Sequence, residues 1–475
     1  MAELLRPDIC VIGGGSGGLS VAAAAAAFGV PVVLVEKGKM GGDCLNTGCV
    51  PSKSLIAAAR RARNIADAAL FGVTAREIAV DFQRVHDHVH GIIAAIAPND
   101  SRQRFTGLGV RVIEGVARFK DATTVAVGDD ILIAARRFVI ATGSSPVSPP
   151  IAGLDATAHF TNETIFDLAI RPEHLIVIGA GPVGLELAQA FRRLDSAVTV
   201  LEAAEPLATE EPECAAIVLD QLAREGIAVR SGVAVSRVSQ AETKVRVAFN
   251  SGNGEETIEG SHLLIATGRR PNVEGLELET AGVAYAEKGI VVDQGLRTSN
   301  RRVYAIGDVA GGPQFTHAAN YHAGLVIRNV LFRLPVRAHA AAIPRVTFTD
   351  PELAHFGLTE TEARRRGHTI RVLRWPYQEN DRAQAEREVK GHIKIITGKQ
   401  GRILGATIVG ASAGELIATW ALAIAHRLNI RALAGIVMPY PTLSEIGKRA
   451  AVTYFTPGLT SPWVRRIISL LRRFG

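Results

Sequence analysis

Apolar and polar positions alternate in blocks along the first part of the chain, and each block predicts one element. Residues 9–12 form a short, wholly apolar run typical of a buried strand, and a glycine-rich turn follows at 13–18. An alanine-rich stretch at 19–28 predicts a helix, and a second apolar run at 31–35 predicts a strand that ends at Glu36. Strand, turn, helix and strand together indicate one α/β unit.

The same plan returns 166 residues later. It comprises a strand at 175–178, a glycine-rich turn at 179–184, a helix at 185–194 and a strand at 198–201 that ends at Glu202. One such turn is weak evidence for nucleotide binding, but two complete units in register make coincidence improbable. The sequence therefore predicts an α/β fold with two Rossmann-type domains, each of which binds a dinucleotide.

Each turn carries the pattern Gly-x-Gly-x-x-Gly, and each glycine has a task. The first glycine allows the tight turn, the second lets the backbone approach a pyrophosphate, and the third lets the helix pack on the strand. In chain order these glycines are Gly13, Gly15 and Gly18 in the first turn and Gly179, Gly181 and Gly184 in the second. The N-terminus of the helix that follows faces the phosphate charge.

The acids at the ends of the two units predict how each unit treats a ribose. Glu36 can accept hydrogen bonds from ribose hydroxyls. Glu202 bonds a 2′-hydroxyl and repels a 2′-phosphate, and residues 203–208 hold no arginine to receive that phosphate. We therefore expect NADH as the nicotinamide cofactor, with NADPH less favoured.

Two of the four cysteines, Cys44 and Cys49, lie five residues apart directly after the first unit. On a regular helix their Cα atoms would be about 8 to 9 Å apart, whereas a disulfide tolerates no more than about 7 Å. Gly48 and Pro51 predict an irregular first turn that closes this gap. A helix N-terminus would also lower the pKa of a cysteine placed there.

A redox-active disulfide is the favoured interpretation of this pair. We disfavour a structural bridge, because the chain has few cysteines and a strand is predicted where a secretory signal would lie. A zinc site would need a second close pair, which Cys10 and Cys214 do not form. Cys10 falls in the first strand and is expected in the core, while Cys214 has no evident partner.

Composition limits the class of protein. At 475 residues the chain is too long for one ordinary core, so several domains are expected. It contains no apolar run of about 18 residues that would predict a transmembrane helix. The net charge of +7 is weak evidence for anionic partners, and no nucleic-acid partner is predicted. We expect a cytoplasmic location, with peripheral contact to the inner face of a membrane as the alternative.

With a cysteine pair between two such units, the chain resembles the class I pyridine nucleotide-disulfide oxidoreductases over residues 8 to about 456. The resemblance implies FAD as the cofactor. It implies that Asp308 bonds the flavin ribitol and that Lys53 lies near the flavin, paired with Glu186. Further positions expected at the cofactors are Gly115, the motif Ala141-Thr142-Gly143, the pair Gly268-Arg269, and Gly307.

The resemblance also divides the chain. It implies a FAD-binding domain at 1–148 and 270–342, an NAD(P)-binding domain at 149–269, an α+β dimerisation domain at 343–458 and a basic tail at 459–475. The protein is therefore expected to be a homodimer. In the family's chemistry, NADH delivers hydride to the flavin, and the flavin reduces the disulfide through Cys49. Cys44 then becomes the outward thiolate that meets the substrate.

One position departs from the best-known members. In dihydrolipoamide dehydrogenase and glutathione reductase a histidine, oriented by a glutamate that matches Glu445, shuttles the thiol proton, whereas Tyr440 stands at that position in this chain. Tyrosine has an unperturbed pKa near 10, so acting as a base at neutral pH would cost roughly 4 kcal/mol. A hydrogen bond to Glu445 would raise that pKa further. We expect poor turnover of those two substrates, because a lost proton shuttle costs about 10² to 10⁴ in rate.

The electron acceptor is then a small disulfide or a soft oxidant. Mercuric reductases share the tyrosine but also use a cysteine pair near the C-terminus, and no cysteine follows Cys214. Soluble transhydrogenases share it but lack the complete disulfide. The leading hypothesis is FAD-dependent electron transfer from NADH through Cys44 and Cys49 to such an acceptor. The alternatives are a dihydrolipoamide dehydrogenase proper and a redox-sensing NAD(H)-binding flavoprotein with low turnover.

Some histidines could suggest other sites. His86 and His90 would share a helix face, with His88 between them, but no carboxylate-rich or cysteine partner adjoins them in the sequence. A solvated helix face is therefore favoured, and no metal site is predicted. His317 follows the Asp308 motif, and a functional imidazole there is the minority interpretation.

The last residues form a basic amphipathic pattern. From 463 to 474, apolar side chains fall on one face of a predicted helix and four arginines fall on the opposite face. Contact with an anionic membrane through residues 461–475 and packing on the dimer both fit this pattern. The apolar residues are Trp463, Ile467, Leu470, Leu471 and Phe474, and the arginines are Arg465, Arg466, Arg472 and Arg473.

Overall fold

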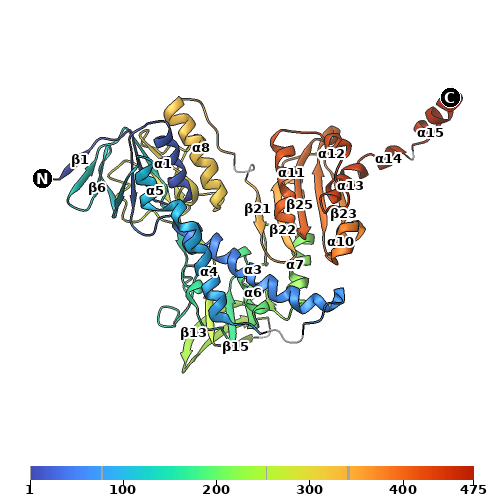
Figure 1. Ribbon diagram of the computed structural model, residues 1–475, viewed down its shortest axis with the longest axis horizontal. Coiled ribbons are helices and arrows are strands. Elements are labelled where there is room, and N and C mark those ends of the chain that lie inside the picture. Colours follow the sequence, from blue (N-terminus) through green and yellow to red (C-terminus); the bar gives the residue numbers. More distant parts are fainter. Residues whose placement is uncertain (1, 76–78, 253, 340–342, 460, 475) are drawn as a thin grey trace. The chain divides into compact units, whose positions relative to one another are not determined.

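The chain forms two compact units (Figure 1). The first unit comprises residues 1–203 and 230–340, and the second comprises 204–229 and 341–475. The computed structural model describes residues 2–75, 79–252, 254–339, 343–459 and 461–474. The end of the second FAD-binding segment, 340–342, and residues 460 and 475 of the tail therefore lie outside the described residues. The division into three domains and a basic tail stays a prediction.

A five-stranded parallel sheet carries the first glycine turn. The strand order is β20-β8-β2-β3-β4. The strands are β2 (Ile9–Ile12), β3 (Val32–Glu36), β4 (Arg111–Glu114), β8 (Arg137–Ile140) and β20 (Val303–Ala305). β2 pairs with strands on both sides and is buried on both faces, which explains why all four of its residues are apolar. The predicted strand at 9–12 is confirmed, and the one predicted at 31–35 lies one residue further along.

Helices cover one face of this sheet. α1 (Ser16–Ala27) and α8 (Thr316–Phe332) pack side by side, and their apolar side chains form one core with Ile9 and Val11 of β2 (Figure 1). Most of the buried residues of α1 are small, namely Gly17, Gly18, Ala22 and Ala25 beside Leu19 and Val21, which lets the helix approach the strands closely. The helix predicted at 19–28 is confirmed, although it starts earlier, at Ser16.

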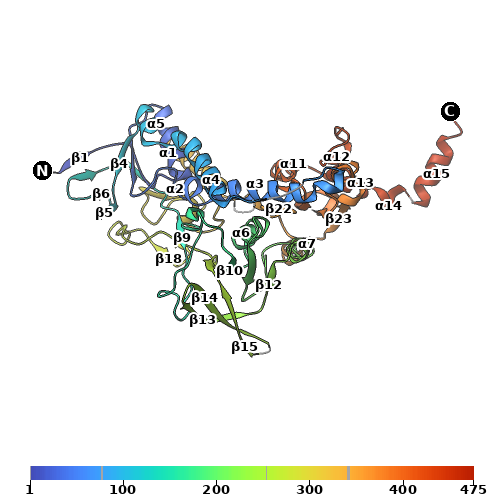
Figure 2. The same ribbon diagram turned by 60° about the horizontal axis from the view of Figure 1, so that its bottom comes forward.

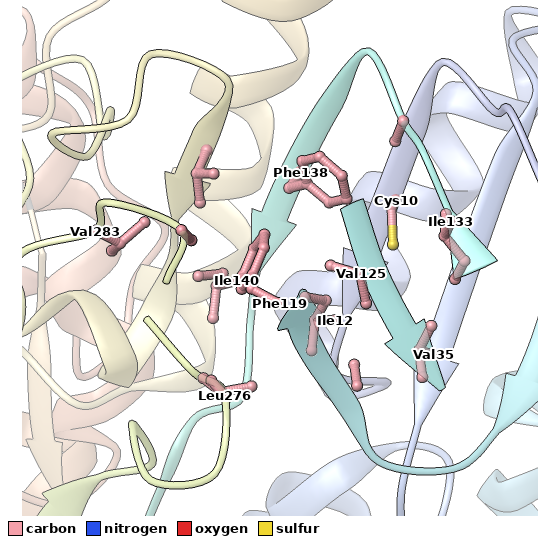
Figure 3. Close-up of a cluster of buried hydrophobic side chains, with 14 of the residues drawn as sticks. Cys10, Ile12, Val35, Phe119, Val125, Ile133, Phe138, Ile140, Leu276 and Val283 are labelled. Atoms are coloured by element: carbon pink, nitrogen blue, oxygen red, sulfur yellow. The ribbon is translucent and has the colours of Figure 1, made fainter. Parts of the chain in front are cut away.

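A second, smaller sheet covers the other face. Its order is β1-β7-β6-β5, and its strands are β1 (Glu3–Leu5), β5 (Ala117–Asp121), β6 (Thr124–Val127) and β7 (Ile131–Ile133). Figure 3 shows Cys10 and Ile12 among side chains of these strands, such as Val125 and Ile133. Cys10 has no exposed surface, and its burial raises the pKa of its thiol to about 12. The prediction that Cys10 is a core residue is confirmed.

The second glycine turn lies on another parallel sheet of the first unit. β10 (His174–Ile178) lies between β11 (Ala197–Leu201) and β16 (His262–Ile265), and α6 (Pro182–Arg193) follows the turn. An antiparallel sheet packs on it through a shared apolar cluster. That sheet contains β13 (Ala234–Ala241), β14 (Lys244–Ser251) and β15 (Gly254–Gly260). The repeated strand, turn, helix and strand predicted from the sequence is confirmed.

The cysteine segment connects the first glycine turn to two long helices. α2 (Gly42–Asn46) precedes α3 (Cys49–Ala66), and α3 packs against both α4 (Phe82–Ile96) and α6 (Figure 2). α5 (Arg102–Gly107) leads into β4. A short antiparallel pair, β9 (Ser144–Pro146) and β17 (Arg269–Pro271), joins the two segments that leave the parallel sheets.

An antiparallel sheet with helices on both faces forms the second unit. The strand order is β21-β22-β25-β24-β23. The strands are β21 (Arg345–Thr347), β22 (Glu352–Gly357), β23 (Arg371–Pro376), β24 (His392–Thr397) and β25 (Ile403–Gly410). On one face, side chains such as Ile393 and Ile395 share a core with α11 (Ala413–Ala425) and α13 (Glu445–Thr453). Residues 204–229, including α7 (Pro212–Arg224), belong to this unit although they fall inside the predicted NAD(P)-binding segment.

Further helices of the second unit are short. They are α9 (Glu360–Arg365), α10 (Asp381–Glu386), α12 (Ile430–Gly435), α14 (Thr456–Leu459) and α15 (Pro462–Leu471). α15 ends at Leu471, so the helix predicted over 463–474 is three residues shorter at its C-terminus. Among the described residues, we find no helix with the length and apolar character needed to cross a membrane.

Candidate functional site

Cys44 and Cys49 lie on two different helices, as the spacing argument requires. Cys44 is in the short helix α2, which ends at Asn46, and Cys49 is the first residue of α3. Gly48 lies between the helices, and a Cβ atom there would come within 2.8 Å of the Asp43 carboxylate and 2.9 Å of its carbonyl oxygen. The prediction of an irregular turn at Gly48 is confirmed, and a larger residue at that position would push the two helices apart.

The two thiols have opposite electrostatic character. A hydrogen bond from Cys44, followed by Thr316 and the charge of Lys53, lowers the pKa of Cys49 to about 6, although partial burial and Asp43 oppose this. The pKa of Cys44 is raised, first because its thiol donates to Cys49 and then because it is partly buried. The pair therefore carries its first negative charge on Cys49 at neutral pH and keeps a proton on Cys44.

Thr316 is a contact that the sequence analysis missed. It is the first residue of α8, and its hydroxyl oxygen lies 3.5 Å from the sulfur of Cys49. A hydroxyl can donate to a thiolate, which is why this contact favours the charged form of Cys49. The two residues are 267 positions apart, so no local pattern in the sequence connects them.

Lys53 and Glu186 form the ion pair that the family resemblance implied. Lys53 lies one turn after Cys49 on α3, and its ammonium donates to the Glu186 carboxylate on α6 at 2.8 Å. Glu186 is 5% exposed, so its charge needs this partner. The pair joins the helix of the cysteines to the helix of the second glycine turn.

The first glycine turn has the shape that a dinucleotide requires. A Cβ atom at Gly13 would lie 2.4 Å from the Ala141 carbonyl oxygen, and one at Gly18 would lie 1.9 Å from that of Gly13. Packing within the protein thus demands these two glycines. At Gly15, by contrast, a Cβ would meet nothing closer than 3.8 Å. That open side, at the uncapped N-terminus of α1, fits an approaching pyrophosphate and so fits FAD.

The second turn repeats this geometry. A Cβ at Gly179 would lie 2.4 Å from the Ala266 carbonyl oxygen, and one at Gly184 would lie 2.0 Å from that of Gly179. A Cβ atom at Gly181 would have no neighbouring atom within 4 Å, and this residue precedes the N-terminus of α6, which has no side-chain cap. The same test therefore supports a second dinucleotide at this turn.

The acids at the strand ends contact the glycine turns. The Glu36 carboxylate accepts from the backbone N–H of Gly14 and, at 2.7 Å, from that of Gly38. Glu202 accepts from the backbone N–H of Ala180 at 2.7 Å. Each carboxylate is thereby fixed at the end of its strand, in the position where a ribose hydroxyl would be expected.

Gly115 contacts the strand that ends at Glu36. Its backbone N–H donates to the Glu36 carbonyl oxygen at 2.8 Å, and a Cβ atom there would lie 2.6 Å from Val127. Its role at the cofactor stays a prediction, since these contacts explain the glycine by packing alone.

Hydrogen bonds join the motif Ala141-Thr142-Gly143 to the segment that begins with the pair Gly268-Arg269. The Thr142 hydroxyl donates to the Asn272 carbonyl at 2.7 Å, and the Asn272 side-chain amide donates back to the Thr142 carbonyl at 3.0 Å. The Asn272 backbone N–H also donates to the Gly143 carbonyl oxygen. The Gly268 carbonyl oxygen accepts from the Val147 N–H at 3.0 Å, which is a further bond between the two segments.

Asp308 lies in a hydrogen-bond chain that also includes Arg269. The Ser144 hydroxyl donates to Asp308 at 2.6 Å, and Arg269 donates to the same hydroxyl at 2.8 Å. Burial raises the pKa of Asp308, while Ser144 and Arg269 oppose that rise. Arg269 also lies 3.4 Å from Asp43, the neighbour of Cys44. This series of polar contacts therefore runs from the predicted ribitol site to the cysteine segment. Gly307 starts this motif, and its N–H donates to His322 at 3.2 Å.

Tyr440 has a different hydrogen-bond partner from the one considered in the sequence analysis. Its hydroxyl donates to the Asp381 carboxylate at 2.7 Å rather than to Glu445. The side-chain amide of Asn380 donates to the Thr442 carbonyl at 3.0 Å, which holds this loop against the start of α10. The hydrogen bond and charge of Asp381 raise the pKa of Tyr440, so the phenol keeps its proton. Tyr440 is 68% exposed.

The expected solvated histidine face is found in part, because His88 is exposed and the side chain of His90 is 39% exposed, whereas that of His86 is 23% exposed. Carboxylates of Asp87 and Asp167 lie 3.2 and 3.6 Å from the rings of His86 and His90. Asp167 comes from a distant segment that folds against α4, which the sequence could not reveal. The expectation that Cys214 has no partner is wrong. Cys214 does have a partner, because its sulfur lies 3.6 Å from Nε2 of His392 on β24. His317 stacks on Phe315 with ring centroids 5.1 Å apart, and its function stays untested.

A buried ammonium lies among three carboxylates in the second unit. Lys394 of β24 contacts Glu211, Glu213 and Glu360 at 2.8, 2.6 and 2.9 Å. Of the described residues, these three acids form the one group close enough together to hold a metal ion, and the lysine already supplies positive charge there. Burial alone would raise the pKa of Glu213, but Arg374 and Lys394 lower it to about 2.

Comparisons with known proteins agree with this arrangement. Residues 7–323 match the family described as pyridine nucleotide-disulphide oxidoreductase, and residues 343–451 match its dimerisation domain. The chain is 36% identical to a mercuric reductase from Streptomyces lividans over 456 residues, covering 94% of this chain and 96% of the relative. It is 34% identical to a dihydrolipoyl dehydrogenase from Geobacillus stearothermophilus over 458 residues, with the same coverage.

Solved structures are also similar. The Cu(II) complex of the HOCl-induced flavoprotein disulfide reductase RclA from Escherichia coli superposes with a TM-score of 0.85 at 28% identity. The match covers 94% of this chain and 99% of that chain. The α/β fold with two nucleotide-binding units and a C-terminal dimerisation domain, predicted from the sequence, is confirmed.

Proposed function

Since the chain belongs to the pyridine nucleotide-disulphide oxidoreductase family, we propose that it is an NADH-dependent reductase whose Cys44–Cys49 pair passes electrons to a thiophilic metal ion. The family depends on FAD and takes its electrons from NAD(P)H, so these are the cofactors of this enzyme. Bound FAD supplies the transfer of the electron pair from the nicotinamide hydride to the disulfide.

The charge distribution of the cysteine pair supports this proposal more than any other observation. With its pKa lowered to about 6, Cys49 holds a thiolate at neutral pH, while Cys44 keeps its proton. In the proposed cycle Cys49 faces the flavin and Cys44 faces the acceptor. Loss of two electrons and the one remaining proton from the reduced pair restores the disulfide, and Lys53 stabilises the negative charge on Cys49 while the pair is reduced.

The proton balance favours a metal ion over a disulfide as the acceptor. Reducing a substrate disulfide produces two thiols, so protons must be placed on the leaving sulfurs. A metal ion accepts the two electrons, either in one step or as single electrons on two ions, and the proton of Cys44 goes to solvent. Tyr440 cannot readily shuttle protons, because Asp381 holds its hydroxyl and raises its pKa. A metal ion makes no such demand, and thiolate ligands suit soft metals.

Two relatives whose descriptions include such metal ions add weight to this choice. One similar protein is named a mercuric reductase, and one similar structure holds Cu(II). No cysteine follows Cys214 in this chain, so we assign capture of the ion to Cys44 and Cys49 alone. Cys10 and Cys214 have no exposed surface and would not compete for it.

The proposal also specifies the electron donor, the oligomeric state and the location of the enzyme. We assign NADH as the donor because Glu202 is fixed at the end of β11, where its charge repels a 2′-phosphate. The dimerisation domain supports a homodimer, and we assign Tyr440 to the cysteine pair of the partner subunit. A cytoplasmic location suits a cysteine pair that must return to its reduced form, since thiols are kept reduced there.

A dihydrolipoyl dehydrogenase is the second candidate, because the chain is 34% identical to one. An acceptor comparison separates the two functions. NADH oxidation by the FAD-loaded enzyme is followed without oxygen, using mercuric ion, cupric ion, lipoamide or oxidised glutathione, with each metal supplied as a buffered complex. Wild type should reduce at least one metal ion faster than either disulfide.

Two variants make the comparison decisive. Cys44→Ser should lose metal reduction, whereas Cys214→Ala, which alters a buried cysteine in the other unit, should keep it. Faster turnover of lipoamide than of every metal ion would reject the proposed acceptor and favour the second candidate. Unchanged metal reduction in Cys44→Ser would reject the role of the cysteine pair.

A further inference from the structure

The C-terminal helix α15 and the turn that follows it form an unusual surface. We propose that residues 461–474 bind reversibly to the headgroups of an anionic lipid bilayer. None of the residues of α15 is buried against the rest of the chain. This proposal is independent of the electron acceptor, since it concerns a segment outside the nucleotide and cysteine sites.

One side of this segment is apolar and open. Trp463 is 71% exposed, Leu471 is 60% exposed, and Phe474 beyond the end of the helix is 81% exposed. The exposed fractions of Ile467, Ile468 and Leu470 are 41%, 51% and 54%. Successive helix residues turn by about 100°, which places these side chains along one side of the helix. Exposing so many large apolar groups together marks a binding surface.

The opposite side carries only positive charge. Arg465 and Arg466 lie in the helix, and Arg472 and Arg473 lie in the turn that ends it. Glu445 is the last acidic residue in the sequence, so the segment has no acidic side chain of its own to neutralise these arginines. A helix that is apolar on one side and arginine-rich on the other is typical of segments that lie in the interface of an anionic membrane.

Charge decides between lipid and a second copy of this chain. Two copies of the segment packed face to face would bring eight arginines together with no acid in either segment. The dimerisation domain of the family matches residues 343–451 and so ends before the segment begins. An anionic bilayer offers both an apolar layer for Trp463 and its neighbours and negative charge for the arginines.

The strength of the contact should depend on salt and on each arginine. A basic residue near an anionic bilayer contributes roughly 1 kcal/mol. Removing two arginines should therefore weaken binding by about thirtyfold, because each factor of ten corresponds to about 1.4 kcal/mol. Raising the ionic strength should weaken it as well, since salt screens the attraction.

Vesicle sedimentation tests the proposal with the full-length, FAD-loaded protein. One set of vesicles contains equal parts of phosphatidylglycerol and phosphatidylcholine, and a second set contains phosphatidylcholine alone. Wild type should sediment with the first set only. Deleting residues 461–475, or changing Ile467 and Leu471 together to Ser, should abolish sedimentation.

Matched charge variants separate the segment from the net charge of the protein. The double change of Arg465 and Arg466 to Gln should weaken binding about thirtyfold. The same pair changed to Lys should bind nearly as wild type does. Changing Arg118 and Lys120 to Gln removes two exposed charges from the other unit and should have little effect.

Three results would overturn the proposal. The first is wild type that does not sediment with the anionic vesicles, and the second is truncated protein that sediments equally well. The third is loss of the dimer on truncation, measured by analytical ultracentrifugation without lipid, because the segment would then pack on the dimer. NADH-dependent flavin reduction should be the same in wild type and truncated protein.

Discussion

The hydroxyl oxygen of Thr316 lies 3.5 Å from the sulfur of Cys49, at the point where the first turn of α8 meets the first turn of α3. It is a side-chain hydrogen bond to the thiol whose pKa is lowered to about 6. The contact therefore helps to stabilise the negative charge on Cys49.

Removing this hydroxyl should weaken the thiolate. A hydrogen bond to a charged group contributes about 1.5 kcal/mol, so Thr316→Val should lower the ratio of thiolate to thiol at Cys49 roughly tenfold at a given pH. The measurement is the ultraviolet thiolate absorbance of the reduced enzyme during a pH titration, with the same variant carrying Cys49→Ser subtracted. Thr316→Ser keeps the hydroxyl and should titrate as wild type does. An unchanged titration in Thr316→Val would remove Thr316 from the mechanism.

Tyr440 offers a second test. Asp381 keeps the proton on the phenol, whereas an imidazole with an ordinary pKa of about 6.5 could exchange a proton at neutral pH. Because a positioned proton shuttle contributes about 10² to 10⁴ in rate, Tyr440→His should raise lipoamide turnover at least a hundredfold. Reduction of a metal ion should change little.

The control for this substitution is Tyr440→Phe, which removes the hydroxyl and supplies no base. It should leave both activities close to those of wild type. If Tyr440→His has the lipoamide turnover of wild type, the missing shuttle does not limit the reaction, and the proton argument for a metal acceptor fails.

Glu202 should govern the choice between NADH and NADPH. Glu202→Arg replaces a group that repels a 2′-phosphate with one that binds it, so the ratio of kcat/KM for NADPH to that for NADH should rise about a hundredfold. Glu202→Gln keeps an acceptor for the Ala180 N–H and should shift the ratio less. Glu205→Arg places the same charge three residues away and is the matched control. An unchanged ratio in Glu202→Arg would refute the assignment.

Some parts of this arrangement follow from the sequence for local reasons. The two glycine turns are recognisable because steric contacts within a few residues, such as Gly18 against the Gly13 carbonyl, admit only glycine. The buried strand β2 is recognisable because both of its faces are covered, which requires an unbroken apolar run. The break between α2 and α3 was predictable from Gly48 and from the geometry of the cysteine pair.

Other parts depend on contacts between distant residues and leave no local pattern. Thr316 is 267 residues from Cys49, and His392 is 178 residues from Cys214. The choice of Asp381 rather than Glu445 by Tyr440 depends on how α10 meets a loop 59 residues away. Lys394 is equally unremarkable in the sequence, where a lysine among isoleucines would be read as a solvent-facing residue of a strand.

The buried position of Lys394 leads to a prediction about stability. Its side chain is almost fully buried against Glu211, which is 2% exposed, so Lys394→Met would leave a buried carboxylate without its main partner. Breaking a buried ion pair in this way costs about 3 to 5 kcal/mol. Urea unfolding of the second unit should show this loss, and adding Glu211→Gln should restore part of it. Lys399→Met, at an exposed position near the end of the same strand, should be close to neutral.

Glu213 makes the same cluster sensitive to acid. Arg374 and Lys394 lower its pKa from an ordinary value of 4.5 to about 2 in the folded protein. A carboxyl group whose pKa is lower when folded stabilises the fold fully above its unfolded pKa and loses that effect as the pH falls through its folded pKa. Wild type should therefore be more heat-stable than Glu213→Gln above pH 4.5, and the difference should shrink between pH 4.5 and about 2. Thermal unfolding across this range measures it, and a difference that stayed constant down to the lower limit would show that the carboxylate charge is not what stabilises α7 on the sheet.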